Sequence, residues 1–357
     1  MITEDIARCR LVNQQIARPT LATPGDVVAW LGAVQAQDYL GALWAVGLRT
    51  PGASEATVEQ AIADRTIVRT WPMRGTLHFV APADVRWMLE LLTPRVVQGR
   101  QGRLRQLGLD AQIIAASAEV VARALAGGRQ LTRAELYAAL EQAGIVAGNQ
   151  RGIHILGQLA HQQLICFGPR AGKQPTFTLL DEWVPRAARL PRDEALATLA
   201  LRYFTSHGPA TLQDFMWWAG LSTADARAGL GAAGALLAHT LVGGQAYYFA
   251  HEPAALPDAG QAFLLPPFDE FLLGYRDRSA ALDPQFTNLV NPGSNGIFNP
   301  IVVIDGRVQG TWRRTFKRGA VAMAFSPFRS FSAAQHGALT TAAAGYGAFV
   351  GAPVQLG

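Results

Sequence analysis

Three stretches of the chain repeat one pattern of apolar and polar positions. Each stretch has an amphipathic helical segment, an apolar run, a short polar turn and a second apolar run, at residues 58–80, 155–180 and 226–250. Apolar positions at helical spacing predict a helix, and the two runs around a turn predict a β-hairpin. Helical patterns of suitable length precede each stretch, which is the order of a winged helix-turn-helix. The pattern therefore predicts three such modules in tandem.

Capping residues mark where several of these helices begin. Residues 132–135 and 211–214 each start with threonine and end with an acidic residue three positions later, the spacing of a capping box. In the first module Thr23 stands at the cap position and Pro24 at the first helical position. These signals fix the expected helix starts independently of the apolar pattern.

The last hundred residues have a different pattern. Short apolar runs broken by proline and glycine follow one another between residues 263 and 328, and Asp305 with Gly306 forms a hairpin signal between two of them. The alanine-rich stretch 332–350 predicts a closing helix. We expect a β-rich, barrel-like module here.

The predicted fold class is α+β, with three tandem winged helix-turn-helix modules and a β-rich, barrel-like C-terminal module. The chain has 357 residues, 50% of them hydrophobic, which is enough for several packed modules. The expected boundaries are 1–95, 96–185, 186–256 and 257–357.

The chain has no run of 18 or more uncharged apolar residues, and its first residues are already helical in pattern. Cys9 and Cys166 fit neither a disulfide framework nor a thiolate metal site, so we expect two core residues in a reducing compartment. His154 and His161 share a helix face, but no third ligand has a suitable spacing. We therefore expect a soluble cytoplasmic protein without a membrane span, metal or cofactor.

The charge balance allows a nucleic-acid partner. The formal net charge is +5, and all basic residues except Lys173 and Lys317 are arginine. Arginine suits phosphate oxygens, so a basic face for nucleic acid is possible. A GC-rich genome, which favours arginine codons, explains the same ratio equally well.

Two groups of residues are candidates for DNA contact. The denser group can hold phosphates, with a solvated charged loop as the alternative, and consists of Trp312, Arg313, Arg314, Lys317 and Arg318. Arg74 and His78 lie on a predicted wing strand, where His78 can equally be a satisfied strand histidine. We expect Trp217 in the core and Trp218 as a cap, not as platforms for stacked bases.

Two glutamines interrupt the apolar stretch LGAVQAQDYLGALW at residues 31–44. On one continuous helix Gln35 and Gln37 would point about 200° apart. If the helix that starts at Thr23 ends near Val34, the following backbone can bring both to the same side. Spacing alone favours ordinary polar residues at a helix end, and it likewise favours a solvated carboxylate at Asp38.

Four sequence stretches together resemble the AlkZ-like (YcaQ-related) bacterial DNA glycosylases over nearly the whole chain. These stretches are QAQ at 35–37, WPMRGTLHFVAPAD at 71–84, FLLPPFDEFLLGYRDR at 263–278 and NGIFNPIVVIDGRVQGTWRR at 295–314. The resemblance implies tandem winged helices, a β-rich C-terminal part and a signature of Gln, an aliphatic residue, then Gln or Asp. It places Gln35 and Gln37 at the two polar positions of that signature, and Ala36 where the family often has a bulkier residue.

The resemblance implies a DNA glycosylase that acts on double-stranded DNA. Two amides without an acid predict a substrate activated by its own charge, a cationic N7-alkylated purine, with bulky adducts and interstrand crosslinks as the implied class. Neither Lys173 nor Lys317 is near Gln35 in sequence, so we expect a monofunctional enzyme without a Schiff base. A base that already carries positive charge leaves as a neutral molecule and needs no general acid. Gln35 and Gln37 would then stabilise the oxocarbenium-like sugar and aim a water at C1′. We expect a monomer without a cofactor, associated with the nucleoid.

A non-catalytic tandem winged-helix protein, either a DNA-binding factor or a scaffold, is the alternative. The third helices of the second and third modules are rich in alanine, glycine and leucine. A sequence-specific DNA-binding factor uses polar side chains of this helix to contact the edges of bases, so the composition argues against that class. Release of free 7-methylguanine by the purified protein would separate these classes.

Overall fold

The computed structural model forms two compact units. The first unit combines Met1–Val58 with Leu196–Gly357, and the second unit is the continuous segment Glu59–Ala195. The residues described by the structure are 2–184, 189–251, 255–294 and 296–357. Each unit therefore has its own fold, and the first is assembled from two distant parts of the sequence.

The first part of the first unit is mainly helical. Its elements are α1 (Ile2–Asn13), α2 (Pro24–Leu31), β1 (Val34–Gln35), α3 (Tyr39–Gly47) and the start of α4 (Glu55–Ala63), which continues into the second unit. The hydroxyl of Thr23 caps α2 by accepting the backbone N–H of Asp26, as the sequence predicts. Gly32 ends the helix with φ of +79°, a conformation that favours glycine. The helix thus stops three residues before Val34, and β1 makes the backbone extended where the glutamine motif begins.

The second part of the first unit opens with three helices and a hairpin. The elements are α10 (Arg192–Ser206), which begins at the end of the second unit, α11 (Leu212–Ala219), α12 (Thr223–Ala233), the short η1 (Gly234–Leu236), β7 (Ala238–Val242) and β8 (Gln245–Phe249). The expected capping box is present, because Thr211 accepts the N–H of Asp214 and the Asp214 side chain accepts the N–H of Thr211. The helix and hairpin order predicted for the third stretch is confirmed.

The C-terminal part contains a five-stranded sheet in the order β13-β12-β11-β10-β9. Its strands are β9 (Ala262–Leu265), β10 (Ile301–Ile304), β11 (Arg307–Lys317), β12 (Ala320–Pro327) and β13 (Val354–Leu356). The helical elements are α13 (Glu270–Leu273), η2 (Pro284–Phe286), α14 (Thr287–Val290), η3 (Pro292–Ser294) and α15 (Ala333–Val350). The predicted hairpin turn at Asp305 and Gly306 and the predicted closing helix are both confirmed.

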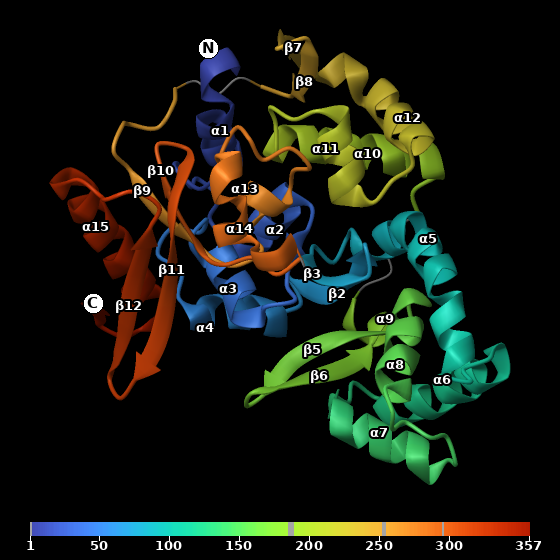
Figure 1. Ribbon diagram of the computed structural model, residues 1–357. Coiled ribbons are helices and arrows are strands. Elements are labelled where there is room, and N and C mark those ends of the chain that lie inside the picture. Colours follow the sequence, from blue (N-terminus) through green and yellow to red (C-terminus); the bar gives the residue numbers. More distant parts are fainter. Residues whose placement is uncertain (1, 185–188, 252–254, 295) are drawn as a thin grey trace. The chain divides into compact units, whose positions relative to one another are not determined.

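The prediction of a barrel-like module is wrong for the part of the chain that the structure describes. The sheet is open, because its edge strands β9 and β13 do not pair with each other. Helix α15 contacts both of these strands. Figure 1 shows this helix beside the sheet, where it covers apolar side chains that barrel closure would otherwise bury. The runs of short strands in the sequence contain no information on whether a sheet closes.

The second unit contains helices and two hairpins. Its elements are β2 (Val68–Met73), β3 (Thr76–Val80), α5 (Val85–Gln106), α6 (Ala111–Leu125), β4 (Leu131–Thr132), α7 (Arg133–Gln142), α8 (Arg151–His161), β5 (Ile165–Ala171), β6 (Gln174–Leu179) and α9 (Leu180–Trp183). Its strands follow the order β3-β2-β5-β6-β4, with Arg69 of β2 opposite Phe167 of β5. The hairpins of the first two repeated stretches therefore lie in one sheet.

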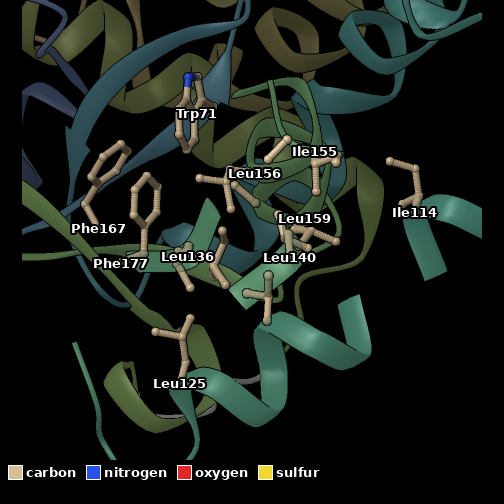
Figure 2. Packing of buried hydrophobic residues seen from close by; sticks show 14 of the residues in the cluster. Trp71, Ile114, Leu125, Leu136, Leu140, Ile155, Leu156, Leu159, Phe167 and Phe177 are labelled. Carbon is tan, nitrogen blue, oxygen red and sulfur yellow. The ribbon is translucent and has the colours of Figure 1, made fainter. Parts of the chain in front are cut away.

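Aromatic and aliphatic side chains form the core of the second unit, as Figure 2 shows. The ring of Phe167 lies 4.9 Å from that of Trp71 and 4.5 Å from that of Phe177, measured between centroids. Helices α6, α7 and α8 add leucine and isoleucine side chains from their apolar faces. Burial of this apolar surface stabilises the second unit.

The mixed helix and strand content of the α+β prediction is confirmed, and Cys9 and Cys166 are both buried. The assignment of three winged helices and the four-module division stay predictions, and the boundary between residues 185 and 186 lies outside the described residues. Within those residues, no helix is long and apolar enough to cross a membrane.

Candidate active site

The glutamine motif lies at the end of β1, directly before α3. Gln35 is 6% exposed, whereas Gln37 is exposed to solvent. The Oε1 atom of Gln35 accepts the backbone N–H of Gln37 at 3.0 Å. The structure therefore brings the two glutamines together, with the side chain of the first lying against the backbone of the second.

Asp38 caps helix α3 and lines a neighbouring pocket. Its Oδ1 atom accepts the backbone N–H of Gly41 at 3.2 Å, so its carboxylate has a definite position at the helix start. A pocket of about 380 Å³ is lined by Asp38 together with Thr311, Arg313 and Arg314 of β11. The pocket combines a carboxylate with guanidinium groups beside the glutamine motif.

A buried carboxylate, Glu270, contacts the motif from the interior of the first unit. Its Oε1 atom accepts the backbone N–H of Gln35 at 3.2 Å. Its Oε2 atom accepts the indole N–H of Trp218 at 2.9 Å and lies 3.4 Å from Nε2 of His207. Glu270 was not among the candidates predicted from the sequence, although an adjacent acidic pair in the apolar stretch FLLPPFDEFLL was a usable signal.

Asp269, next to Glu270, belongs to a second set of buried polar contacts. Its carboxylate forms two hydrogen bonds with the guanidinium of Arg49, at 2.8 and 2.9 Å, and both side chains are 1% exposed. Arg49 also donates to the backbone oxygen of Gln14, whose side-chain amide donates to the hydroxyl of Tyr275. Such pairing satisfies charges that would be costly to bury alone.

A further buried ion pair joins α1 to α11. Arg10 lies 3.8 Å from the carboxylate of Asp214 and 3.6 Å from the centre of the Tyr275 ring. Asp214 also accepts the backbone N–H groups of Arg276 and Asp277. The capping residue predicted from sequence therefore also holds the segment that follows α13.

His207 is a buried histidine beside Glu270. Burial lowers the pKa of His207, although the nearby Glu270 carboxylate opposes this effect. Its Nδ1 atom lies 2.8 Å from the hydroxyl of Ser206, and its ring stacks on that of Tyr203 at 4.8 Å. These contacts fix the ring with Nε2 directed toward Glu270.

The expected roles of the two adjacent tryptophans are reversed. Trp218 is fully buried, whereas Trp217 is 45% exposed. Adjacent residues on a helix differ by about 100° in direction, so only one of the two can face the core. Trp218 shares the buried face with Phe215, three residues earlier.

The predicted basic cluster lies on the hairpin of β11 and β12. Arg313, Lys317 and Arg318 are exposed, and the Arg314 guanidinium lies 5.4 Å from the centre of the Tyr346 ring. Trp312 differs from the others, because it is 2% exposed and donates its indole N–H to the backbone oxygen of Leu265. The hairpin therefore exposes basic side chains to solvent, and the buried Trp312 holds the hairpin in place through its bond to Leu265.

The structure also brings Arg74 and His78 together, within the second unit. Arg74 lies in the turn between β2 and β3 with φ of +51°, and its Nη2 atom is 3.4 Å from Nε2 of His78. His78 is fully buried, and its Nδ1 atom lies 3.0 Å from the backbone oxygen of Thr76. Of this pair, only Arg74 has a partly exposed side chain.

His154 and His161 both lie on α8, as the spacing predicts. Burial lowers the pKa of His161 to about 4, and the positive charge of Arg100 contributes. Within the described ranges, no three histidine, cysteine or acidic side chains are grouped as metal ligands would be.

Comparison with known proteins identifies the family. The model of the family "DNA glycosylase AlkZ-like" matches residues 28–349. A protein of Streptomyces sahachiroi described as an interstrand DNA cross-link repair glycosylase is 30% identical over 318 residues, which cover 85% of each chain. The solved structure of the Streptomyces sahachiroi DNA glycosylase AlkZ superposes with a TM-score of 0.82 at 28% identity, covering 99% of both chains. The chain therefore belongs to the AlkZ-like DNA glycosylases, enzymes that hydrolyse N-glycosyl bonds.

Proposed function

We propose that this glycosylase is monofunctional and removes cationic N7-alkylated purines from double-stranded DNA, with Gln35 and Gln37 as its catalytic residues. The observation that supports this most directly is the geometry of the motif. The hydrogen bond from the Gln37 N–H to Gln35 Oε1 holds the two residues together, while the exposed Gln37 is accessible to a substrate. The enzyme would act as a monomer on chromosomal DNA at the nucleoid.

Two amides suit a leaving group that is activated by its own charge. Alkylation at N7 makes the purine cationic, so the glycosidic bond breaks without a proton from the enzyme. The remaining tasks are to stabilise positive charge on the sugar and to direct a water to C1′. Preorganised amide oxygens can perform both tasks without being protonated or deprotonated.

The wider lesion class is suggested by the related protein and by the pocket beside the motif. The relative from Streptomyces sahachiroi is described as a cross-link repair glycosylase. In the present chain, the pocket of about 380 Å³ next to Asp38 has room for part of a bulky substituent. We propose that the substrates include bulky N7 adducts and interstrand crosslinks.

Binding of the duplex is assigned to the basic hairpin and to Arg74. Arg313, Arg314, Lys317 and Arg318 would contact phosphates, while Trp312 keeps the hairpin in place through its bond to Leu265. The buried His78 would support Arg74 and not contact DNA itself.

Release of free base from a methylated duplex tests the function. The parental protein should release 7-methylguanine, and Gln35→Ala and Gln37→Ala should each lower the excision rate by about 10- to 1000-fold. Gln245→Ala, which changes an exposed glutamine of β8, is the matched control and should keep the parental rate. Duplex binding without base release would support a DNA-binding factor, and the lack of both would support a scaffold.

A further inference from the structure

The carboxylate of Glu270 lies between the glutamine motif and the interior of the first unit. The residue is 1% exposed and starts α13, 235 positions after Gln35. Its two oxygens have different partners. Oε1 accepts the backbone N–H of Gln35, and Oε2 accepts the indole N–H of Trp218.

Two hydrogen bonds in series connect Glu270 to the exposed glutamine. Glu270 accepts the N–H of Gln35 at 3.2 Å, and the side chain of Gln35 accepts the N–H of Gln37 at 3.0 Å. The first bond fixes the main chain from which the Gln35 side chain extends. The second bond fixes the main chain from which the Gln37 side chain extends. Glu270 is therefore connected to the main chain of Gln37 through Gln35.

The far side of the Glu270 carboxylate is also held. Trp218 donates to Oε2 at 2.9 Å, and Nε2 of His207 lies 3.4 Å from the same atom. Since the Trp218 indole can only donate, Oε2 must be an acceptor. Since the Gln35 backbone N–H is a donor too, Oε1 must also accept. A glutamine at this position would direct its NH2 group at one of these donors.

We propose that Glu270 is a positioning residue of the glycosylase reaction, which acts through Gln35 to hold Gln37 in its productive place. The inference rests on the proposed role of the glutamines. A displacement of about 1 Å in a catalytic group can cost about 100-fold in rate. Because Glu270 is 1% exposed, its replacement should affect the chemical step and not DNA affinity.

The first test compares Glu270→Gln with Asp214→Asn. Both changes replace a buried carboxylate by an amide in the same unit, but Asp214 contacts Arg10, Thr211 and the loop at Arg276. Glu270→Gln should lower the single-turnover excision rate by about 10- to 100-fold at unchanged duplex affinity. Asp214→Asn should lower the melting temperature and keep the parental rate well below that temperature. Equal rate losses in the two folded variants would overturn the proposal.

A double-mutant cycle tests whether Glu270 acts through Gln35. In Gln35→Ala the connection to Gln37 is already lost, so adding Glu270→Gln should slow excision no further. Multiplied losses would contradict the proposal, because they would mean that the two residues act independently. If Gln35→Ala and Gln37→Ala both excise at the parental rate, the proposed function fails, whatever Glu270 does.

Trp218→Phe covers the case in which Glu270→Gln does not fold. Phenylalanine keeps an aromatic ring in the core but removes the N–H that holds Oε2. A folded Trp218→Phe protein should excise several-fold more slowly with unchanged duplex affinity. A parental rate in this variant, or in a folded Glu270→Gln protein, would refute the positioning role.

Discussion

The two glutamines of the motif have different surroundings, although both are the same residue type in one short motif. Gln35 is buried and hydrogen-bonded to the motif's own backbone, whereas Gln37 is exposed. The sequence predicted the helix start at Thr23, but it gave an end near Val34 only as a condition for bringing both glutamines to one side. It could not predict their unequal burial or the contact of Gln35 with Glu270, a residue far away along the chain.

Replacement of both glutamines should reveal whether they act as a unit. We expect Gln35→Ala/Gln37→Ala to excise 7-methylguanine little more slowly than the worse single variant, because either change alone already disrupts the arrangement. Gln37→Asp should retain most activity, since the family that the motif resembles has Asp as an alternative there. Single-turnover rates of base release measure both effects. A double variant whose loss equals the product of the single losses would show independent roles.

His161 should make folding sensitive to acid. Its pKa is about 4 in the folded protein, below the ordinary value of about 6.5, so below pH 6.5 the unfolded chain binds a proton that the folded chain does not. Stability is full above pH 6.5 and should fall by up to about 3 kcal/mol toward pH 4. His161→Phe should lose less stability over this range in denaturant titrations. His336→Gln, at an exposed histidine, is the control, and parallel curves for all three proteins would exclude the effect.

At the scale of elements, local signals were reliable and long-range pairing was not. The capping threonines at 23, 132 and 211 all accept the predicted backbone N–H, and the Asp305 turn joins β10 to β11 as expected. These features depend on residues within four positions of each other. Sheet closure depends on which distant edges meet, and there the barrel-like prediction was wrong. Pairing of β2 with β5 was likewise not visible in the sequence.

The β11 and β12 hairpin should control duplex affinity through charge alone. Arg313 and Lys317 lie on the same strand and are both exposed, so Arg313→Ala/Lys317→Ala should weaken binding of any duplex sequence. The slope of the logarithm of the binding constant against the logarithm of the salt concentration should become shallower by about two. Fluorescence anisotropy at several salt concentrations measures this slope. Arg227→Ala, at an exposed arginine of α12, should change neither quantity. An unchanged slope in the double variant would place the phosphate contacts elsewhere.

At the scale of the whole molecule, the family model and the structural superposition both cover nearly the full length of the chain. The family model covers residues 28–349, and the AlkZ structure superposes on 99% of the chain. Sequence patterns alone predicted the order of helices and hairpins, but not that the first unit combines two segments separated by 137 residues, Glu59–Ala195. Contacts between such segments leave no local pattern in the sequence.

The chain should not form a covalent intermediate with DNA. Its only lysines are Lys173, in the turn between β5 and β6, and Lys317, at the end of β11, and a Schiff base requires an amine at the sugar. Borohydride treatment during turnover should therefore trap no protein–DNA adduct, and the product should be an abasic site. A trapped adduct would make the N-terminal amine the next nucleophile to examine.

Base release should also be unchanged in EDTA. A loss of base release in EDTA that zinc restores would contradict the metal-free mechanism.

The divided first unit has a consequence for synthesis of the protein on the ribosome. The glutamine motif is made early, but its contact Glu270 follows 235 residues later. At about 5–20 residues per second, the motif waits at least about ten seconds before its partner exists. The continuous segment Glu59–Ala195, which forms the compact second unit, is synthesised completely within that interval. A nascent chain therefore contains the glutamine motif long before the contact between Gln35 and Glu270 can form. Any chain that ends before α13 should contain the motif but should not excise bases.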